Sequence, residues 1–232
     1  MSELQGFGFV VPHWMYWSWL AVMPLVLMYL IKRNASNEVE VPLTPDEELV
    51  LELLAQEDPT HNIEGNIITK VIDKISEFTG VFIALWTVTA VVAYFYEVVM
   101  RYIFNMPTIW VHESSFLLFG MQYLMTGAYA MLHGAHVRVD IMYIKLPPRG
   151  RVGMDIFTSV FFFIFVLALM GTSWKFFISS YGMHEVSLET WGIQYWPVKM
   201  LMFTGACLLT LAGISKLIKD IMLYRQMGEG KQ

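Results

Sequence analysis

Residues 101–113 read RYIFNMPTIWVHE, a short polar and aromatic stretch between two long apolar runs. The run before it extends from about Phe78 to Met100, and the run after it from about Ser114 to Leu132. Runs of about 20 apolar residues are long enough to cross a bilayer as helices. Asparagine and proline between them favour a turn. The stretch therefore predicts a hairpin of two membrane-spanning helices.

The composition of the whole chain agrees with a membrane protein. Of its 232 residues, 56% are hydrophobic and only 15% are charged, and the mean hydropathy is +0.51, far from the balance of a soluble domain. A formal charge of −5 argues against nucleic acid as a partner. The single cysteine, Cys207, excludes an intrachain disulfide and a cysteine metal cluster.

Three further apolar runs bring the predicted number of spanning helices to five. They cover about Trp14 to Ile31, Met154 to Phe177 and Pro197 to Met222. The first is predicted to be a retained anchor, because residues 1–11 lack the positive charge that begins a signal peptide. The fold class expected is therefore all-α, an integral membrane bundle of four core helices plus one N-terminal helix.

The basic residues predict the orientation of this bundle, because short loops rich in lysine and arginine stay in the cytoplasm. Every second predicted loop is basic. The basic residues on this side are Lys32, Arg33, Lys70, Lys74, Arg138, Lys145, Arg149, Arg151, Lys216, Lys219, Arg225 and Lys231. We therefore expect the N-terminus outside the membrane and the C-terminus in the cytoplasm.

The sequence divides into three predicted regions: an N-terminal membrane helix at 1–33, an acidic cytoplasmic linker at 34–66 and a four-helix membrane domain at 67–232. The linker contains nine acidic residues and no lysine or arginine. Within it, Thr44 as a helix cap and Glu47 three residues later predict a short amphipathic helix. The alternative is a solvated linker with one marginal helix.

The charges of the predicted hairpin call for partners. A charged group near the hydrocarbon costs several kcal/mol if unpaired. Glu97 lies four residues before Arg101, on the same helix face, so one arginine can serve both Glu97 and Glu113. The alternative is an arginine that extends to the membrane surface without a partner.

The loop after the third predicted helix reads HGAHVRVDI, in which His136, Arg138 and Asp140 alternate with apolar residues. The alternation predicts a segment half buried on a partner subunit or, as an alternative, on its own bundle. A metal site is disfavoured, because the spacing is loose and the loop is basic. The following LPPRGR stretch presents Arg149 and Arg151 to lipid phosphates or to an acidic surface.

The motifs of the hairpin and of the following loop are similar, in order and placement, to the pattern of a known family. The matching positions are Arg101, Tyr102, Trp110, Glu113, Gly134, His136, Val137, Val139, Asp140, Leu146 and Pro147. The sequence resembles the DctQ-type small membrane subunit of tripartite ATP-independent periplasmic (TRAP) transporters over about residues 70–222. The extra N-terminal helix and acidic linker resemble those of the longer members of that family.

The resemblance implies a non-catalytic subunit of the bacterial inner membrane, without a cofactor. Its expected partners are a large DctM-type membrane subunit, a periplasmic substrate-binding protein and membrane lipids. The function implied is sodium-coupled uptake of an organic acid or similar small anion, with this chain bracing the large subunit. The residues expected at structural or partner contacts are Glu97, Arg101, Trp110, Glu113, His136, Arg138 and Asp140.

An alternative from another class is the membrane anchor of a redox enzyme, with histidines as haem ligands. All six histidines lie at helix ends or in loops, whereas haem in a bundle needs histidines that face one another between helices. Hydrolytic and phosphoryl chemistry have no support, because we find neither a phosphate-binding glycine loop nor a nucleophile placed beside a base. A visible absorption spectrum of the purified protein separates the anchor from the transporter subunit.

Overall fold

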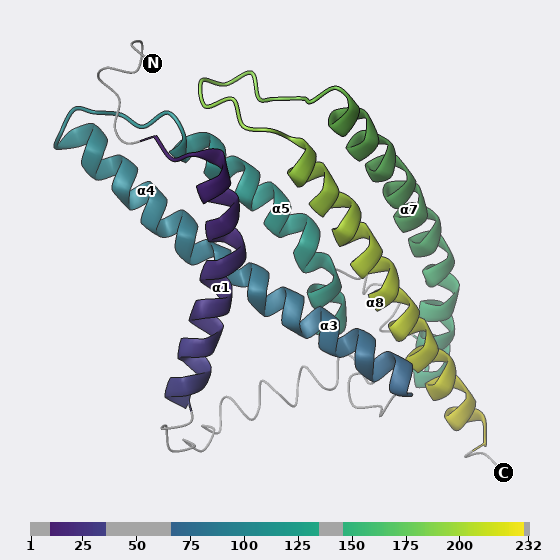
Figure 1. Cartoon of the computed structure of the whole chain (residues 1–232). Coiled ribbons are helices and arrows are strands. Elements are labelled where there is room, and N and C mark those ends of the chain that lie inside the picture. The colour runs from purple at the N-terminus through teal and green to yellow at the C-terminus, as the bar shows by residue number, and fades with distance from the viewer. Residues whose placement is uncertain (1–9, 36–65, 135–145, 230–232) are drawn as a thin grey trace. The chain divides into compact units, whose positions relative to one another are not determined.

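The computed structural model describes residues 10–35, 66–134 and 146–229, which are almost entirely helical (Figure 1). The helices are α1 (His13–Ala35), α3 (Ile67–Ala84), α4 (Trp86–Tyr102), α5 (Val111–Leu132), α7 (Pro148–Gly182) and α8 (Trp196–Glu229). Only Leu85 separates α3 from α4, and the two together are one of five helical segments long and apolar enough to cross a membrane. The predicted all-α membrane bundle is confirmed.

Several of these helices extend beyond the apolar runs that predicted them. The second span begins at Ile67 rather than near Phe78, and α7 begins at Pro148 rather than near Met154. An apolar run stops at the first charges, whereas a helix continues through charges that find partners. Asp73, inside the added part of α3, has such a partner in Lys219.

The chain forms two compact units, which are described separately. Unit 1 comprises residues 1–38, 81–126 and 173–203, and unit 2 comprises residues 39–80, 127–172 and 204–232. The boundaries between them fall inside α3, α5, α7 and α8, so each of these helices contributes to both units.

In unit 1, a tryptophan compensates for a proline inside α1. Pro24 has no N–H, so the carbonyl of Leu20 lacks its usual donor within the helix. The indole Nε1 of Trp86 on α4 donates to this carbonyl at 2.9 Å, and both Leu20 and Trp86 are buried. The bond satisfies a backbone group that has no water available in a bilayer, and it attaches α1 to α4.

A glutamine side chain provides hydrogen bonds at the break between α3 and α4. Gln122 of α5 donates through Nε2 to Thr87 Oγ1 at 2.9 Å and lies 3.4 Å from the carbonyl oxygen of Ile83. These two groups lie on either side of Leu85, where the helical pattern breaks. A polar side chain from a neighbouring helix thus supports irregular backbone inside a predicted span.

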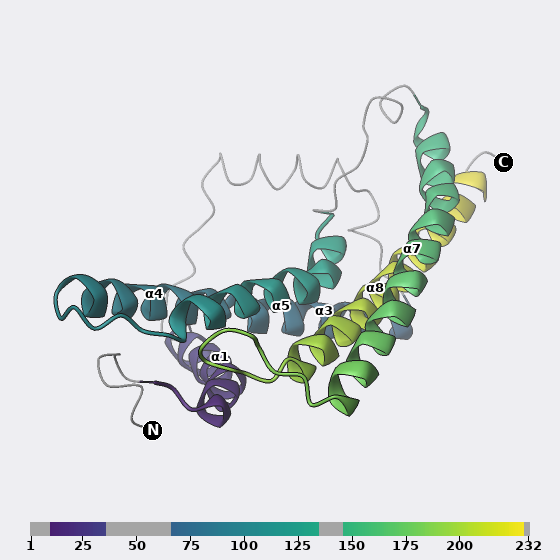
Figure 2. The ribbon, with the colours of Figure 1, turned by 90° about the horizontal axis from the view of Figure 1, so that it is seen from above.

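In unit 2, glycines allow helices to approach closely. The unit's parts of α7 and α8 run side by side in both ribbon views (Figures 1 and 2). A methyl group added at Gly213 of α8 would lie 2.4 Å from a ring carbon of Phe162 on α7. One added at Gly80 of α3 would lie 2.5 Å from Cβ of Tyr129 on α5. Small residues permit this packing, which is the main attraction between helices in lipid.

Unit 2 also contains a charged contact between α3 and α8. Asp73 accepts hydrogen bonds from Ser215 Oγ at 2.8 Å and from Lys219 Nζ at 2.7 Å. The side chains of Lys219 and Asp73 are 12% and 24% exposed, so the pair is largely shielded. This contact joins residues 146 positions apart in the sequence.

Candidate functional site

The charged hairpin between α4 and α5 is the first candidate site, and its centre is Glu97. Arg101 Nε donates to Glu97 Oε1 at 2.7 Å, and Nη2 of the same arginine contacts the same oxygen. Glu97 is buried, whereas about half of the Arg101 side chain is exposed. The expected pairing of Glu97 with Arg101 one helical turn later is confirmed.

The second oxygen of Glu97 holds the far end of the loop. Thr108 donates to Glu97 Oε2 from its backbone N at 2.9 Å and also from its hydroxyl. Asn105 adopts a left-handed conformation with φ of 52°, which asparagine tolerates better than most residues. Met106 N donates to Met100 O at 2.9 Å. The carboxylate of Glu97 therefore fixes the path of the chain between the two helices.

Glu113 departs from the prediction. It is 7% exposed in the first turn of α5, and neither of its oxygens has a hydrogen-bond partner within the described part of the chain. The prediction that Arg101 also serves Glu113 is wrong. An i,i+4 partner is set by the helix itself, whereas a partner across the turn depends on the loop path, which the bond from Thr108 to Glu97 fixes.

A tryptophan in the loop between α7 and α8 connects three segments of unit 1. Trp191 Nε1 donates to Val11 O at 2.9 Å, and the carbonyl of Trp191 lies 3.0 Å from His13 Nε2. Its ring meets the rings of Tyr16 and Trp110, with centroids 5.2 and 6.3 Å away. Trp191, which is 6% exposed, thus contacts the start of α1 and the turn before α5.

The loop that carries Trp191 is itself a short hairpin. Val186 and Gln194 form an antiparallel bridge, Ser187 N donates to Ile193 O at 2.8 Å, and Gly192 takes a φ of 64° that favours glycine. At its base, the hydrogen bond from the Lys199 ammonium group lowers the pKa of Glu185 below its usual range. This loop therefore has a defined shape outside the helices.

Comparison with known families identifies a family whose match includes the hairpin between α4 and α5. The sequence matches the family described as "Tripartite ATP-independent periplasmic transporters, DctQ component" over residues 90–222, more than half of the chain. The chain belongs to the DctQ family. A comparison with curated proteins found no match. The chain is therefore the small membrane subunit of a TRAP transporter and a multi-pass protein of the inner membrane.

The DctQ match divides unit 1 into two parts. It begins within α4 and ends within α8. It therefore includes the Trp191 loop and the group formed by Glu97 with its donors Arg101 and Thr108, which we call the Glu97 clamp. Helices α1 and α3 both lie outside it. The contacts of Trp191 with Val11 and His13 therefore attach a segment outside the match to the DctQ region.

Arg149 and Arg151, which were predicted to contact lipid headgroups, lie in unit 2 and not at the hairpin. Arg149 lies over the ring of Tyr224, with its guanidinium carbon 4.9 Å from the centroid, and Arg151 Nε donates to Leu146 O at 3.1 Å. Both arginines belong to unit 2. The predicted contact residues His136, Arg138 and Asp140 lie outside the described residues, as does the predicted helix of the acidic linker.

Sequence reasoning missed two residues that organise this region, Thr108 and Trp191. Thr108 follows the loop proline, and its short hydroxyl side chain next to a turn was a signal of a local capping role. Trp191 stands in ETWGIQ, a loop stretch that also contains Glu, Thr and Gln. A large aromatic residue in a loop that otherwise turns towards water is a signal of burial against another segment.

The redox-anchor alternative is not favoured by membership of a transporter family. Across the three described stretches, no group of three or more His, Cys, Asp or Glu side chains is arranged to hold a metal ion. His13 and His133 instead contact Trp191 O and Glu77 Oε2, at 3.0 and 2.8 Å. These contacts give both rings roles in packing.

Proposed function

We propose that this DctQ subunit braces a large DctM-type subunit during sodium-coupled uptake of an organic acid or similar small anion. A periplasmic binding protein delivers that anion to the complex. In this proposal the N-terminus and the Trp191 loop face the periplasm, and the C-terminus and the acidic linker at 34–66 face the cytoplasm. The subunit is a fixed frame, against which the large subunit moves.

The contacts around Trp191 support this arrangement. The basic residues predict that the start of α1, the α4–α5 turn and the α7–α8 loop lie on one side of the membrane. In unit 1 these three segments touch one another through Trp191. Loops that contact one another share a side of the bilayer, which agrees with the alternating topology and with five spans.

The hydrogen bonds that Glu97 accepts support the proposed bracing role. A carboxylate that accepts bonds from Arg101 and Thr108 fixes the hairpin, and bonds to a charged group contribute about 1.5–3 kcal/mol each. By contrast, a pocket of about 710 Å³ in unit 1 has no charged residue in its walls, so it does not suit an organic anion. A hairpin that is fixed by these bonds suits a supporting subunit.

We assign the large subunit's contacts to the predicted residues of the hairpin and the basic loop. Arg101 and Trp110 are partly exposed beside the Glu97 clamp, so the hairpin can present a cation and an aromatic ring to a partner. His136, Arg138 and Asp140 remain predicted contacts in the cytoplasmic loop. Arg149 and Arg151 are predicted to meet lipid headgroups.

Purification of the tagged full chain from its native membrane in mild detergent tests the proposal. Mass spectrometry of the purified material is expected to find a large multispanning protein in about equal amount. The ligand carried by the associated binding protein then identifies the substrate, and uptake into vesicles with and without a sodium gradient tests the coupling. A partner that absorbs in the visible as haem does, or recovery of the chain alone, would overturn the proposal.

Variants of the clamp test the role of the hairpin in assembly. Thr108→Val keeps the side-chain shape but removes the hydroxyl bond to Glu97, and we expect less large subunit per tagged chain. Thr158→Val is the matched control, because it makes the same change at an exposed threonine of α7 in unit 2, whose hydroxyl donates to Asp155 O. Equal recovery with both variants would contradict a role of the clamp in assembly.

A further inference from the structure

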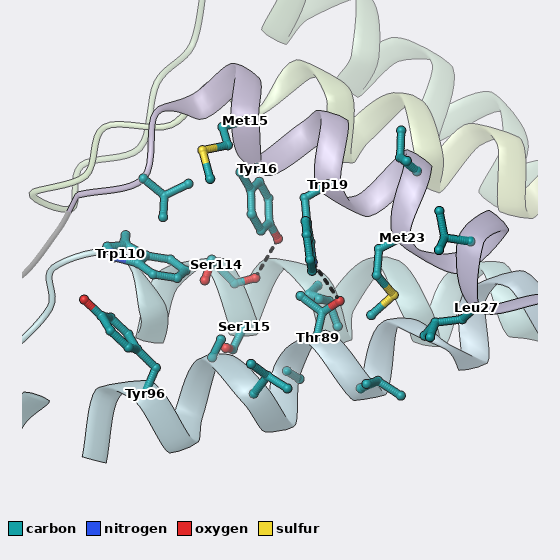
Figure 3. Close-up of a pocket in the computed structure, with 18 residues that line it drawn as sticks. Met15, Tyr16, Trp19, Met23, Leu27, Thr89, Tyr96, Trp110, Ser114 and Ser115 are labelled. Atoms are coloured by element: carbon teal, nitrogen blue, oxygen red, sulfur yellow. Dashed lines mark hydrogen bonds between the residues drawn. The ribbon is translucent and has the colours of Figure 1, made fainter. Parts of the chain in front are cut away.

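A pocket in unit 1 lies between α1 and the pair α4 and α5 (Figure 3). Its volume is about 710 Å³. Met15, Trp19 and Met23 of α1 face Thr89 and Tyr96 of α4 across it. Since α1 and α4 are both predicted spans, the pocket belongs to the hydrocarbon depth of the membrane.

The chemistry of the walls selects an apolar ligand. The eighteen lining residues include no Asp, Glu, Lys, Arg or His. Their polar groups are partly used within the chain, since Thr89 Oγ1 accepts from Trp19 and Ser114 Oγ donates to Val111 O. An ionic or strongly polar ligand would lose its hydration in this pocket without replacement.

The pocket is long and wide enough for an extended methylene chain. Met15 and Leu27 of α1 both line it, and the twelve residues from one to the other advance about 18 Å along the helix. A methylene chain, about 4–5 Å wide because carbon atoms touch near 4 Å, fills roughly 300 Å³.

Hydrogen bonds across the pocket prevent it from widening. Trp19 Nε1 donates to Thr89 Oγ1 at 3.3 Å, and Tyr16 OH donates to the carbonyl of Ser114 at 2.8 Å (Figure 3). The buried bond from Trp86 to Leu20 O fixes α1 to α4 as well. Separating α1 far enough to admit a helix would break all three bonds.

We propose that this pocket binds one acyl chain of a membrane phospholipid. The two methionines adapt to a flexible chain, because their side chains are unbranched and polarizable. Trp110 and Tyr96 line one end of the pocket, and such residues favour the depth of lipid headgroups. Because α1 forms one wall, and α1 lies outside the DctQ match, the site is an addition to the DctQ region.

A matched pair of substitutions tests the proposal. Val91 and Val92 are adjacent on α4 and similarly exposed, at 63% and 61%, but only Val92 lines the pocket. Val92→Trp therefore fills the pocket, and Val91→Trp places the same bulk on another face. Ala93→Phe is a second filling variant, at a less exposed lining position. Thermal unfolding of each variant checks that it is folded.

The measurement is native mass spectrometry of the full chain from vesicles of dioleoyl phosphatidylethanolamine and dioleoyl phosphatidylglycerol, after transfer to detergent. We expect one retained phospholipid with the unchanged chain and with Val91→Trp, and at least a tenfold loss of it with Val92→Trp and Ala93→Phe. A diazirine near the end of the acyl chain should cross-link to pocket residues in the intact vesicle.

Three results would overturn the proposal. They are the absence of a retained lipid, equal retention by the two valine variants, and cross-linking of the pocket to the large subunit in the assembled complex. The last would mean that side chains of the partner fill the pocket. Because none of these measurements depends on transport, the lipid site can fail while the proposed brace stands.

Discussion

In unit 1, ring N–H and O–H groups that donate to backbone carbonyls join the helices, whereas in unit 2 an ion pair and close approach at glycines join them. Tyr16 and Trp86 are the donors in unit 1, and Trp191 attaches Val11, just before α1, in the same way. In unit 2, Asp73 with Lys219 and the contact of Gly80 with Tyr129 serve this purpose.

The difference shows that two kinds of side chain can specify helix contacts in a protein with few charges. An aromatic donor carries most of its surface as apolar ring, so it joins helices inside the hydrocarbon at little desolvation cost. A lysine and an aspartate need shielding from lipid and a fixed geometry, which limits them to a well-shaped contact. Substitutions that remove one kind of contact test whether the two units differ as described.

The largest loss of stability is expected when the ion pair of Asp73 and Lys219 in unit 2 is broken. Asp73→Ala leaves Lys219, a largely buried cation, without its carboxylate, and we expect a loss of about 3 kcal/mol in unfolding free energy. Denaturant unfolding in detergent, followed by circular dichroism, measures it. The double variant Asp73→Leu with Lys219→Leu should recover much of the loss. A double variant less stable than Asp73→Ala would contradict the pairing.

Glycine packing in unit 2 should have the next largest effect. Gly80→Ala brings a methyl group within 2.5 Å of Tyr129 Cβ, which is too close to the backbone for a side-chain rotation to relieve, and we expect a loss of about 2 kcal/mol. Gly171→Ala is the control, because its added methyl group meets no atom within 4 Å. Equal melting temperatures for the two variants would show that α3 and α5 are not closely packed at Gly80.

The aromatic donors of unit 1 can be tested with a compensating pair. Trp86→Phe leaves Leu20 O without a donor, at an expected cost of about 1–2 kcal/mol. Pro24→Ala restores a backbone N–H four residues after Leu20, so Trp86→Phe should cost less in that background. The coupling is measured by thermal unfolding of the four proteins. Strictly additive losses would mean that the indole does not replace the missing helix bond.

The smallest effect on stability is expected at the partly exposed pair of Glu185 and Lys199, at the base of the Trp191 loop in unit 1. The bond from Lys199 holds the pKa of Glu185 below its usual range. A lowered pKa contributes stability that is fully present above the unfolded value of about 4.3 and is lost as the pH falls through the folded value. We expect the melting temperature of Glu185→Gln to fall less below pH 4.3 than that of the unchanged chain. Parallel curves would contradict this contribution.

Much of the fold could be predicted from the apolar runs, and the failures lie at their ends. The five spans follow from length and hydropathy alone, but the start of α3 at Ile67 was missed because Lys70, Asp73 and Lys74 interrupt the apolar pattern. Only the position of Lys219, far away in the sequence, explains why Asp73 is tolerated there. Helix ends that depend on distant partners cannot be read from local composition.

At the charged hairpin, the sequence determined the pair of Glu97 with Arg101, because a spacing of four residues on one helix brings the two side chains together without tertiary contacts. It also determined the membrane class and the DctQ family, through hydropathy and the order of motifs. Tertiary structure decided that Thr108 takes the second oxygen of Glu97, that Glu113 stays buried beside the turn, and that Trp191 joins three segments. These contacts depend on where loops run in space, and no periodicity in the sequence records that path.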